Sequence, residues 1–170
     1  MKKSPPPDER LETMSDAYKE LLEKALERAR QTGTALHHAV SEIRAEAAAV
    51  GKAGEKEVVE LERWVQRDLT DAASYLAQTG KDLKYWLGFD TVLIERAFWD
   101  MFSEAADKTA TEQLKFKIQA DAAGYHTGEL VGLGTLVCDH CGQLLHFHKP
   151  GHIPPCPNCG GTHFLRQSFD

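Results

Sequence analysis

The stretch that decides the fold runs from Gly134 to Gly161 and reads GTLVCDHCGQLLHFHKPGHIPPCPNCGG. It holds all four cysteines of the 170-residue chain, arranged as two Cys-x-x-Cys pairs. Cys138 and Cys141 form the first pair, Cys156 and Cys159 form the second, and fourteen residues separate the pairs. A glycine follows each pair, and glycine tolerates the positive φ that a tight turn needs after the second cysteine. The spacing therefore predicts two equivalent turns, each presenting two thiol groups on one side.

Four cysteines in this pattern favour a metal site. Zn²⁺ is held tetrahedrally by thiolates, and two Cys-x-x-Cys turns supply four of them. A redox role for the pairs is disfavoured because neither lies in a βαβ pattern. The same thiolates bind iron, so a rubredoxin-like iron electron carrier stays open as the lesser alternative. We predict a structural Zn²⁺ on Cys138, Cys141, Cys156 and Cys159, because four protein ligands leave no position for water.

Histidines crowd the same part of the chain. Six of the eight lie beyond residue 124: His126, His140, His146, His148, His152 and His163. A second metal or a pH-sensitive surface is one use for them. Because four thiolates already complete a tetrahedral site, we expect these histidines to be exposed polar residues rather than ligands.

The residues around the cysteines alternate between extended segments and turns. Residues 129–137 are rich in glycine and β-forming residues, and residues 143–148 and 162–166 read as two further short strands. A proline-containing loop at residues 149–155 separates them. We therefore expect residues 125–170 to form a small antiparallel β ribbon.

The chain before residue 125 is helical in pattern. Proline is absent between Asp8 and Lys149, and apolar residues recur at steps of three or four. Residues 8–32, 36–50 and 55–78 read as amphipathic helices whose inward residues include Tyr18, Leu21, Ala25, Ala29, Leu36, Val40, Ile43, Leu61, Val65, Leu69, Ala72 and Leu76. Glycines at 33, 51, 54 and 80 are expected to end them.

Two further helical segments follow Gly80. The first, around residues 83–102, is apolar on most of its circumference, which implies burial on several sides or a partner surface. The second spans residues 109–123, and whether residues 82–123 form one helix or two stays open. The predicted fold is mainly α. It consists of a disordered tail at residues 1–7, a bundle or coiled-coil-like helical domain at residues 8–124, and a C-terminal ribbon at residues 125–170.

Composition excludes several classes of protein. No run approaches the roughly 20 apolar residues of a membrane helix, and the N-terminus lacks the apolar core of a secretory signal. We expect a cytoplasmic protein without a membrane segment. His37 and His38, the only histidines before residue 125, are adjacent and so point to different sides of a helix. We find no convergent acid, base or nucleophile set and predict no enzymatic activity and no catalytic residues.

These features together resemble one family. A helical N-terminal half, the approach Gly128–Val137 to the first cysteine, and the second turn Cys156-Pro157-Asn158-Cys159-Gly160 resemble the YbeL-like zinc-ribbon-containing proteins of proteobacteria. The resemblance implies a cytoplasmic bacterial protein with a helical domain and a zinc ribbon, and it carries no biochemical activity with it. It places the metal ligands at the four cysteines named above.

Charge bears on the partner. The net charge is −6, and residues 125–170 contain two basic and three acidic side chains. Proteins that bind phosphate backbones carry an excess of basic residues, so this composition disfavours a nucleic-acid- or transcription-associated role. That role stays open as the alternative. We expect a non-enzymatic zinc-ribbon protein whose helical domain self-associates or docks on an unknown protein partner.

Overall fold

The computed structural model describes residues 7–50, 55–116 and 124–166. Four long helices, α1 (Pro7–Thr32), α2 (Leu36–Val50), α3 (Glu55–Thr79) and α5 (Arg96–Phe116), precede the short strands. The architecture confirms the predicted class, mainly α with a small antiparallel β ribbon at the C-terminal side. The predicted tail, apart from Pro7, and the predicted helix ends at Gly51 and Gly54 lie outside the described residues. No described helix is both long enough and apolar enough to cross a membrane.

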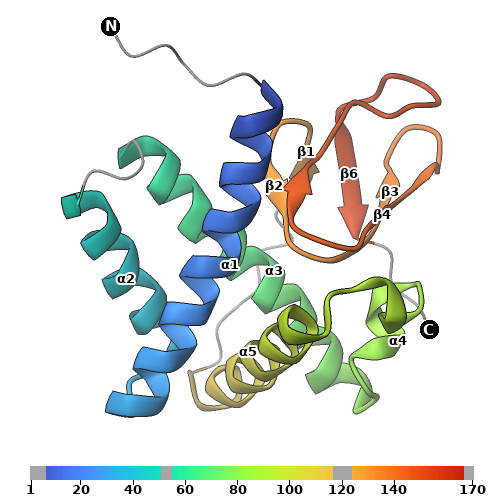
Figure 1. Ribbon diagram of the computed structural model, residues 1–170. Helices are drawn as coiled ribbons and strands as arrows, with labels where there is room; N and C mark the ends of the chain where they lie inside the picture. The colour runs from blue at the N-terminus through green and yellow to red at the C-terminus, as the bar shows by residue number, and fades with distance from the viewer. Residues whose placement is uncertain (1–6, 51–54, 117–123, 167–170) are drawn as a thin grey trace, which may run out of the picture.

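The helices pack as a bundle. Short connections make α1, α2 and α3 successive antiparallel neighbours, and α5 crosses beneath α1 and α3 (Figure 1). Every inward residue named from the periodicity is buried except Leu76, which packs against the core while half-buried. The buried face of α1 is wider than the sequence pattern indicated: Leu22 and Leu26 are also buried. Hydrophobic burial along these stripes is the main force that assembles the bundle.

The apolar segment after Gly80 is not the helix that its composition suggested. It forms α4 (Lys84–Leu87), a 3-10 turn η1 (Thr91–Leu93) and the start of α5. Gly88 ends α4 with a φ of 83°, and the side chain of Asp90 accepts a hydrogen bond from the Val92 amide to begin η1. From Arg96 to Phe116 the chain is one continuous helix, so within the described residues the interruption that the sequence leaves open lies between Leu87 and Arg96 rather than before residue 109.

The ribbon consists of two small antiparallel sheets. The four-stranded sheet has the order β1 (Tyr125–His126), β6 (His163–Arg166), β3 (Gly134–Cys138), β4 (Leu144–Phe147). The second sheet pairs β2 (Leu130–Val131) with β5 (Gly151–His152). The expected strands at residues 129–137, 143–148 and 162–166 correspond to β2 with β3, to β4 and to β6.

The ribbon packs directly on the bundle beside α1 and α3 (Figure 1). Leu130 and Leu133 are fully buried within the same apolar core as the helices. The hydroxyl of Thr135 on β3 donates to the carbonyl oxygen of Leu87 at 2.6 Å. The bundle and the ribbon therefore share part of one core.

A buried carboxylate anchors this contact. Asp68 on α3 is fully buried and accepts hydrogen bonds from the Tyr18 hydroxyl at 2.8 Å and the Gly132 amide at 2.7 Å. Burial, followed by the charge of Asp68, raises the pKa of Tyr18, so that the phenol stays protonated and donates. A methyl group at Gly132 would overlap the Tyr18 hydroxyl, so glycine is what allows the ribbon backbone to approach.

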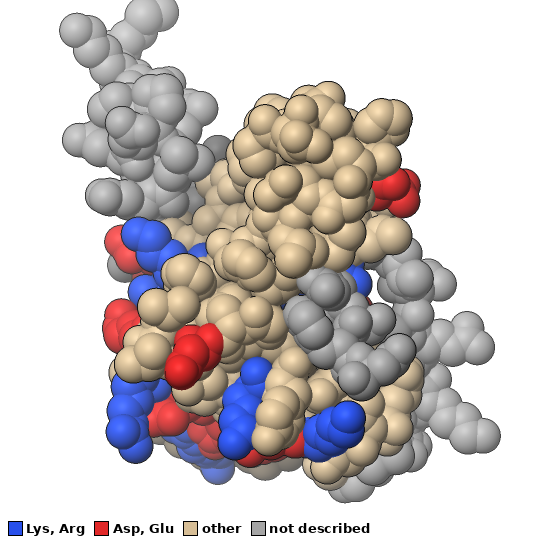
Figure 2. Space-filling view, turned by 90° about the vertical axis from the view of Figure 1, so that its right-hand side faces the viewer, with Lys and Arg blue, Asp and Glu red and all other residues tan. Residues whose placement is uncertain are grey.

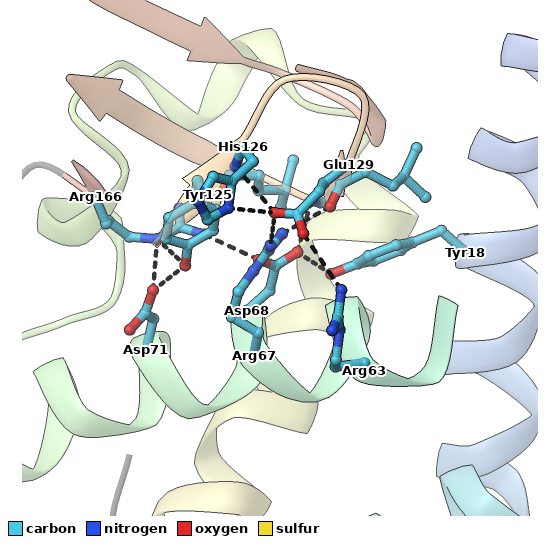
Figure 3. Close-up of polar contacts among 12 residues, drawn as sticks. Tyr18, Arg63, Arg67, Asp68, Asp71, Tyr125, His126, Glu129 and Arg166 are labelled. Carbon is cyan, nitrogen blue, oxygen red and sulfur yellow. Dashed lines mark hydrogen bonds and ion pairs between the residues drawn. The ribbon is translucent and has the colours of Figure 1, made fainter. Parts of the chain in front are cut away.

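Arg166 at the end of β6 supplies the compensating charge (Figure 3). Its side chain is 8% exposed and forms ion pairs with Asp68 and Asp71, both at 3.2 Å. It also donates to the carbonyl oxygen of Leu133 at 2.6 Å and to the Tyr125 hydroxyl at 3.0 Å. Burial raises the pKa of Asp71, and the Arg166 charge opposes that shift. We call Asp68, Asp71 and Arg166 the clamp.

Arg67 supports the clamp one residue before Asp68. It donates to Glu129 at 2.9 Å and to the Leu130 carbonyl oxygen at 2.7 Å. Its guanidinium carbon lies 4.0 Å from the centre of the Tyr125 ring, a cation–π contact. Figure 3 shows the Arg67 side chain reaching from α3 to Glu129 and Tyr125 of the ribbon.

Replacing Arg166 with alanine leaves the Asp68 carboxylate buried without its main counter-charge. We expect Arg166→Ala to lower the free energy of unfolding by about 3–5 kcal/mol, the usual cost of removing one partner of a buried ion pair. Urea unfolding followed by circular dichroism measures this. Arg96→Ala is the control, because that side chain is 94% exposed, and it should change stability by no more than about 0.5 kcal/mol. Equal effects of the two substitutions would contradict the clamp.

Candidate metal centre

The fold brings the four cysteines of the two pairs together. The sulfur atoms of Cys138, Cys141, Cys156 and Cys159 all lie within 4.8 Å of one another. Within the described residues this is the one group of three or more histidine, cysteine or acidic side chains arranged to hold a metal ion. The cysteines are free thiols, and the sulfurs of Cys138 and Cys159 lie 3.6 Å apart, too far for a disulfide.

The two turns have the same backbone hydrogen bonds. The Gly142 amide donates to the Cys138 carbonyl oxygen at 2.9 Å, and the Gly160 amide donates to that of Cys156 at 2.8 Å. The glycines have φ angles of 81° and 76°, which confirms the positive φ predicted at both positions. Residues with a side chain rarely adopt this backbone conformation, so any residue other than glycine at these two positions would be strained.

The spacing of the sulfurs fits a tetrahedral thiolate site. In a regular tetrahedron with metal–sulfur bonds of about 2.3 Å, neighbouring sulfurs lie about 3.8 Å apart. The pairs Cys138–Cys159 and Cys141–Cys156, each joining one turn to the other, are separated by 3.6 and 3.5 Å. Four sulfur donors at this spacing fit Zn²⁺ and also fit iron in a rubredoxin-like site.

Electrostatics explain why such a cluster needs a cation. Hydrogen bonds from the Asn158 side chain and the Gln143 backbone lower the pKa of Cys141 to about 6. For Cys159 the Gly161 amide acts in the same direction, but desolvation and the other three sulfurs outweigh it and raise the pKa to about 12. Four thiolates at this distance repel one another. A divalent cation removes that repulsion and lets all four ionise.

The site is buried on the side facing the ribbon core. Cys138 and Cys156 are buried, whereas Cys141 and Cys159 face solvent. The buried pair packs in a small apolar cluster with Tyr125, Val131, Leu136, Ile153 and Phe164. Phe164 on β6 lies opposite Cys138 on β3, so the strand that ends at Arg166 also supports the first turn.

The histidines lie outside the sulfur cluster. His163 contacts Asp139 at 3.1 Å, and its ring lies 4.8 Å from that of His126. His146 lies 2.9 Å from the Thr135 hydroxyl, and Phe89 packs against both His146 and His148. His152 contacts the Gly128 carbonyl oxygen at 3.1 Å. Each of these contacts accounts for a histidine without a metal ion.

Sequence reasoning missed the clamp, although one signal was present. Asp68 falls three residues after Val65 and four before Ala72, on the apolar face of the helix at residues 55–78. A carboxylate at such a position predicts a buried partner. Arg166 gave no comparable signal, because a basic residue near the chain end reads as exposed.

Comparisons with known proteins agree with this geometry. The model of a family described as a zinc-ribbon containing domain matches residues 22–168. The chain is 33% identical over 161 residues to the uncharacterized protein YbeL of Escherichia coli strain K12, covering 90% of this chain and 95% of that protein. The YbeL proteins of Escherichia coli O6:H1 and O157:H7 match to the same extent. No solved structure matches.

A substitution at Gly161 tests how closely the chain packs against the cysteine sulfurs. A methyl group there would lie 3.2 Å from the sulfurs of both Cys138 and Cys159. We expect Gly161→Ala to weaken metal binding about tenfold or more, since overpacking costs about 1–3 kcal/mol. Competition with a chromophoric chelator measures the affinity. Gly151→Ala is the control, because its methyl group would meet no atom closer than 3.9 Å, and it should bind metal normally. Unchanged affinity in Gly161→Ala would show that the cluster is looser than described.

Proposed function

The chain belongs to the family of zinc-ribbon-containing proteins, and on that basis we propose that it is a non-enzymatic protein-interaction module held together by a structural Zn²⁺. The observation that carries the proposal is the cluster of four cysteine sulfurs within 4.8 Å. Four protein ligands fill a tetrahedral site, so the metal has no open position at which to activate water or substrate. The metal then acts by holding the two turns together.

A binding role follows from the rigidity that the metal gives to the ribbon. A small β segment with few large apolar residues needs a metal or a disulfide to fold stably. The clamp joins the ribbon to the bundle at Asp68 and Asp71. A rigid surface loses little conformational entropy on binding a partner. The ribbon is therefore suited to recognise another protein, and the bundle supports it.

Nucleic-acid binding is the alternative function, and the charge distribution favours it less. The described part of the ribbon contains two basic side chains, and one of them, Arg166, is buried in the clamp. Lys149 alone is exposed. The upper part of the face in Figure 2, formed by the ribbon, is nearly free of charged residues. A tetrathiolate zinc site adds negative charge, which phosphate backbones repel.

Metal content tests the zinc assignment. We expect the chain purified without added metal to contain about one zinc ion per molecule and to be colourless. Cys138→Ser should lose most of the metal, because a ligand is gone, whereas His140→Ser in the same turn should retain it. Elemental analysis and absorption spectroscopy measure both properties. Iron together with visible absorption would replace the zinc assignment with the electron-carrier alternative.

Affinity purification from the native cell tests the interaction role. We expect a protein partner to be recovered with the wild-type chain and with His140→Ser, and to be lost with Cys138→Ser, because the ribbon then unfolds. Mass spectrometry identifies the partner, and light scattering shows whether it is a second copy of this chain. A strictly monomeric mass together with no specific partner would overturn the proposal.

A further inference from the structure

A groove lies where the ribbon meets the bundle, away from the metal centre. It is a hollow of about 500 Å³ between the β4–β5 connection and the segment from η1 to the start of α5, with one residue of α1 on its wall. We call this the junction groove. Its main lining residues are Lys19, Leu93, Glu95, Phe147, His148 and Lys149.

Two consecutive exposed apolar residues adjoin the junction groove, and the second of them, Leu93, lines it. Val92 and Leu93 are 79% and 53% exposed, respectively. The turn that carries them is fixed, because Asp90 accepts hydrogen bonds from the amides of Val92 and Leu93 at 3.0 and 3.1 Å. The next residue, Ile94, is buried in the core. The fold therefore holds these two adjacent side chains in water, where an aliphatic side chain of a partner can pack on them.

An edge strand leads into the groove. β4 is the last strand of its sheet, and Phe147 at its end lines the hollow. Edge strands are commonly protected by charged residues or proline. Residues 143–148 contain neither, Leu144 among them is exposed, and Lys149 and Pro150 follow only beyond the end of the strand, where they line the groove. Its free backbone groups are suited to pair with an extended segment of another protein.

The charge of the groove indicates what that segment carries. Lys19 forms an ion pair with Glu95 at 3.5 Å, so these two charges compensate each other. Lys149 forms no ion pair with any described residue and leaves one uncompensated positive charge. The chain as a whole has a net charge of −6, whereas Lys19, Lys149 and Glu95 give the groove lining a net charge of +1. A carboxylate is the complementary group.

We propose that the junction groove binds an extended acidic segment of a partner protein. The segment adds as a strand to the edge of β4, places a bulky aliphatic side chain against Leu93, and places an aspartate or glutamate next to Lys149. This inference rests on the proposed interaction role and names the surface and the chemistry of its partner. A second copy of this chain is the competing occupant.

Peptide selection tests the proposal on the full metal-loaded chain. A random library of displayed dodecapeptides is selected for binding, and a labelled consensus peptide is titrated by fluorescence anisotropy. We expect the consensus to combine an aliphatic residue with aspartate or glutamate. Lys149→Glu should weaken binding at least tenfold, because it reverses the charge that the peptide meets, and Leu93→Ser should weaken it about tenfold.

Matched controls separate the groove from general effects. Lys81→Glu makes the same charge change on an exposed lysine outside the groove, and Val59→Ser removes an exposed aliphatic side chain from α3. Both should bind the peptide within twofold of wild type, and metal content confirms that every variant is folded. A basic consensus, no consensus, or equal losses in the controls would overturn the proposal. So would a dimer of this chain that Lys149→Glu dissociates.

The outcome is distinguishable from failure of the proposed function. If the partner recovered from the native cell binds wild type and Lys149→Glu equally, the groove is not its site, but the interaction role stands. If the wild-type chain is strictly monomeric and recovers no partner, the interaction role itself fails. Loss of that partner with Lys149→Glu but not with Lys81→Glu supports the groove.

Discussion

The buried carboxylate of Asp68 is the constraint on which the arrangement of bundle and ribbon depends. An ionised side chain that is fully buried is tolerated only with opposite charge and hydrogen-bond donors around it. The bundle supplies Tyr18 and Arg67, whose guanidinium lies 3.5 Å from the carboxylate. The ribbon supplies Gly132 and Arg166, which approach it to 2.7 and 3.2 Å. Neither part satisfies Asp68 alone. Leaving the Asp68 carboxylate without its partners would be costly, so the need to pair it fixes how the ribbon packs on the bundle. The apolar contacts of Leu130 and Leu133 act in the same direction.

Strand β6 connects this constraint to the metal centre. Phe164 pairs with Cys138, next to the sulfur cluster, and Arg166 two residues later reaches Asp68 and Asp71. A metal that fixes the two cysteine turns thus also fixes the strand that carries the clamp. The clamp in turn holds β6 against the bundle. Metal binding and docking of the ribbon stabilise the same element, and both compensate for the small apolar core of the ribbon.

Sequence patterns revealed the features that depend on local chemistry. Cys-x-x-Cys-Gly requires a tight turn wherever it occurs, so the metal centre and its glycines were readable, as were the amphipathic helices with Leu21, Val40 and Val65 inward. The segment after Gly80 was misread as a helix because its apolar content was visible, whereas the effect of Gly88 and Asp90 depends on the backbone path. The clamp joins residues 98 positions apart, Asp68 and Arg166, and one sequence cannot reveal such a pairing.

The burial of Arg166 changes what the composition implies about partners. Counted from the sequence, Lys149 and Arg166 are two cations that the ribbon offers to a ligand. In the structure Arg166 is neutralised inside the protein, and Lys149 beside the junction groove is the remaining exposed cation of the described ribbon. One exposed positive charge in the described ribbon, beside exposed aliphatic residues, favours the proposed single carboxylate on an apolar segment over a phosphate backbone, which needs several cations. Because the clamp takes up the charge of Arg166, Lys149 is the cation of the described ribbon that is left to contact a ligand.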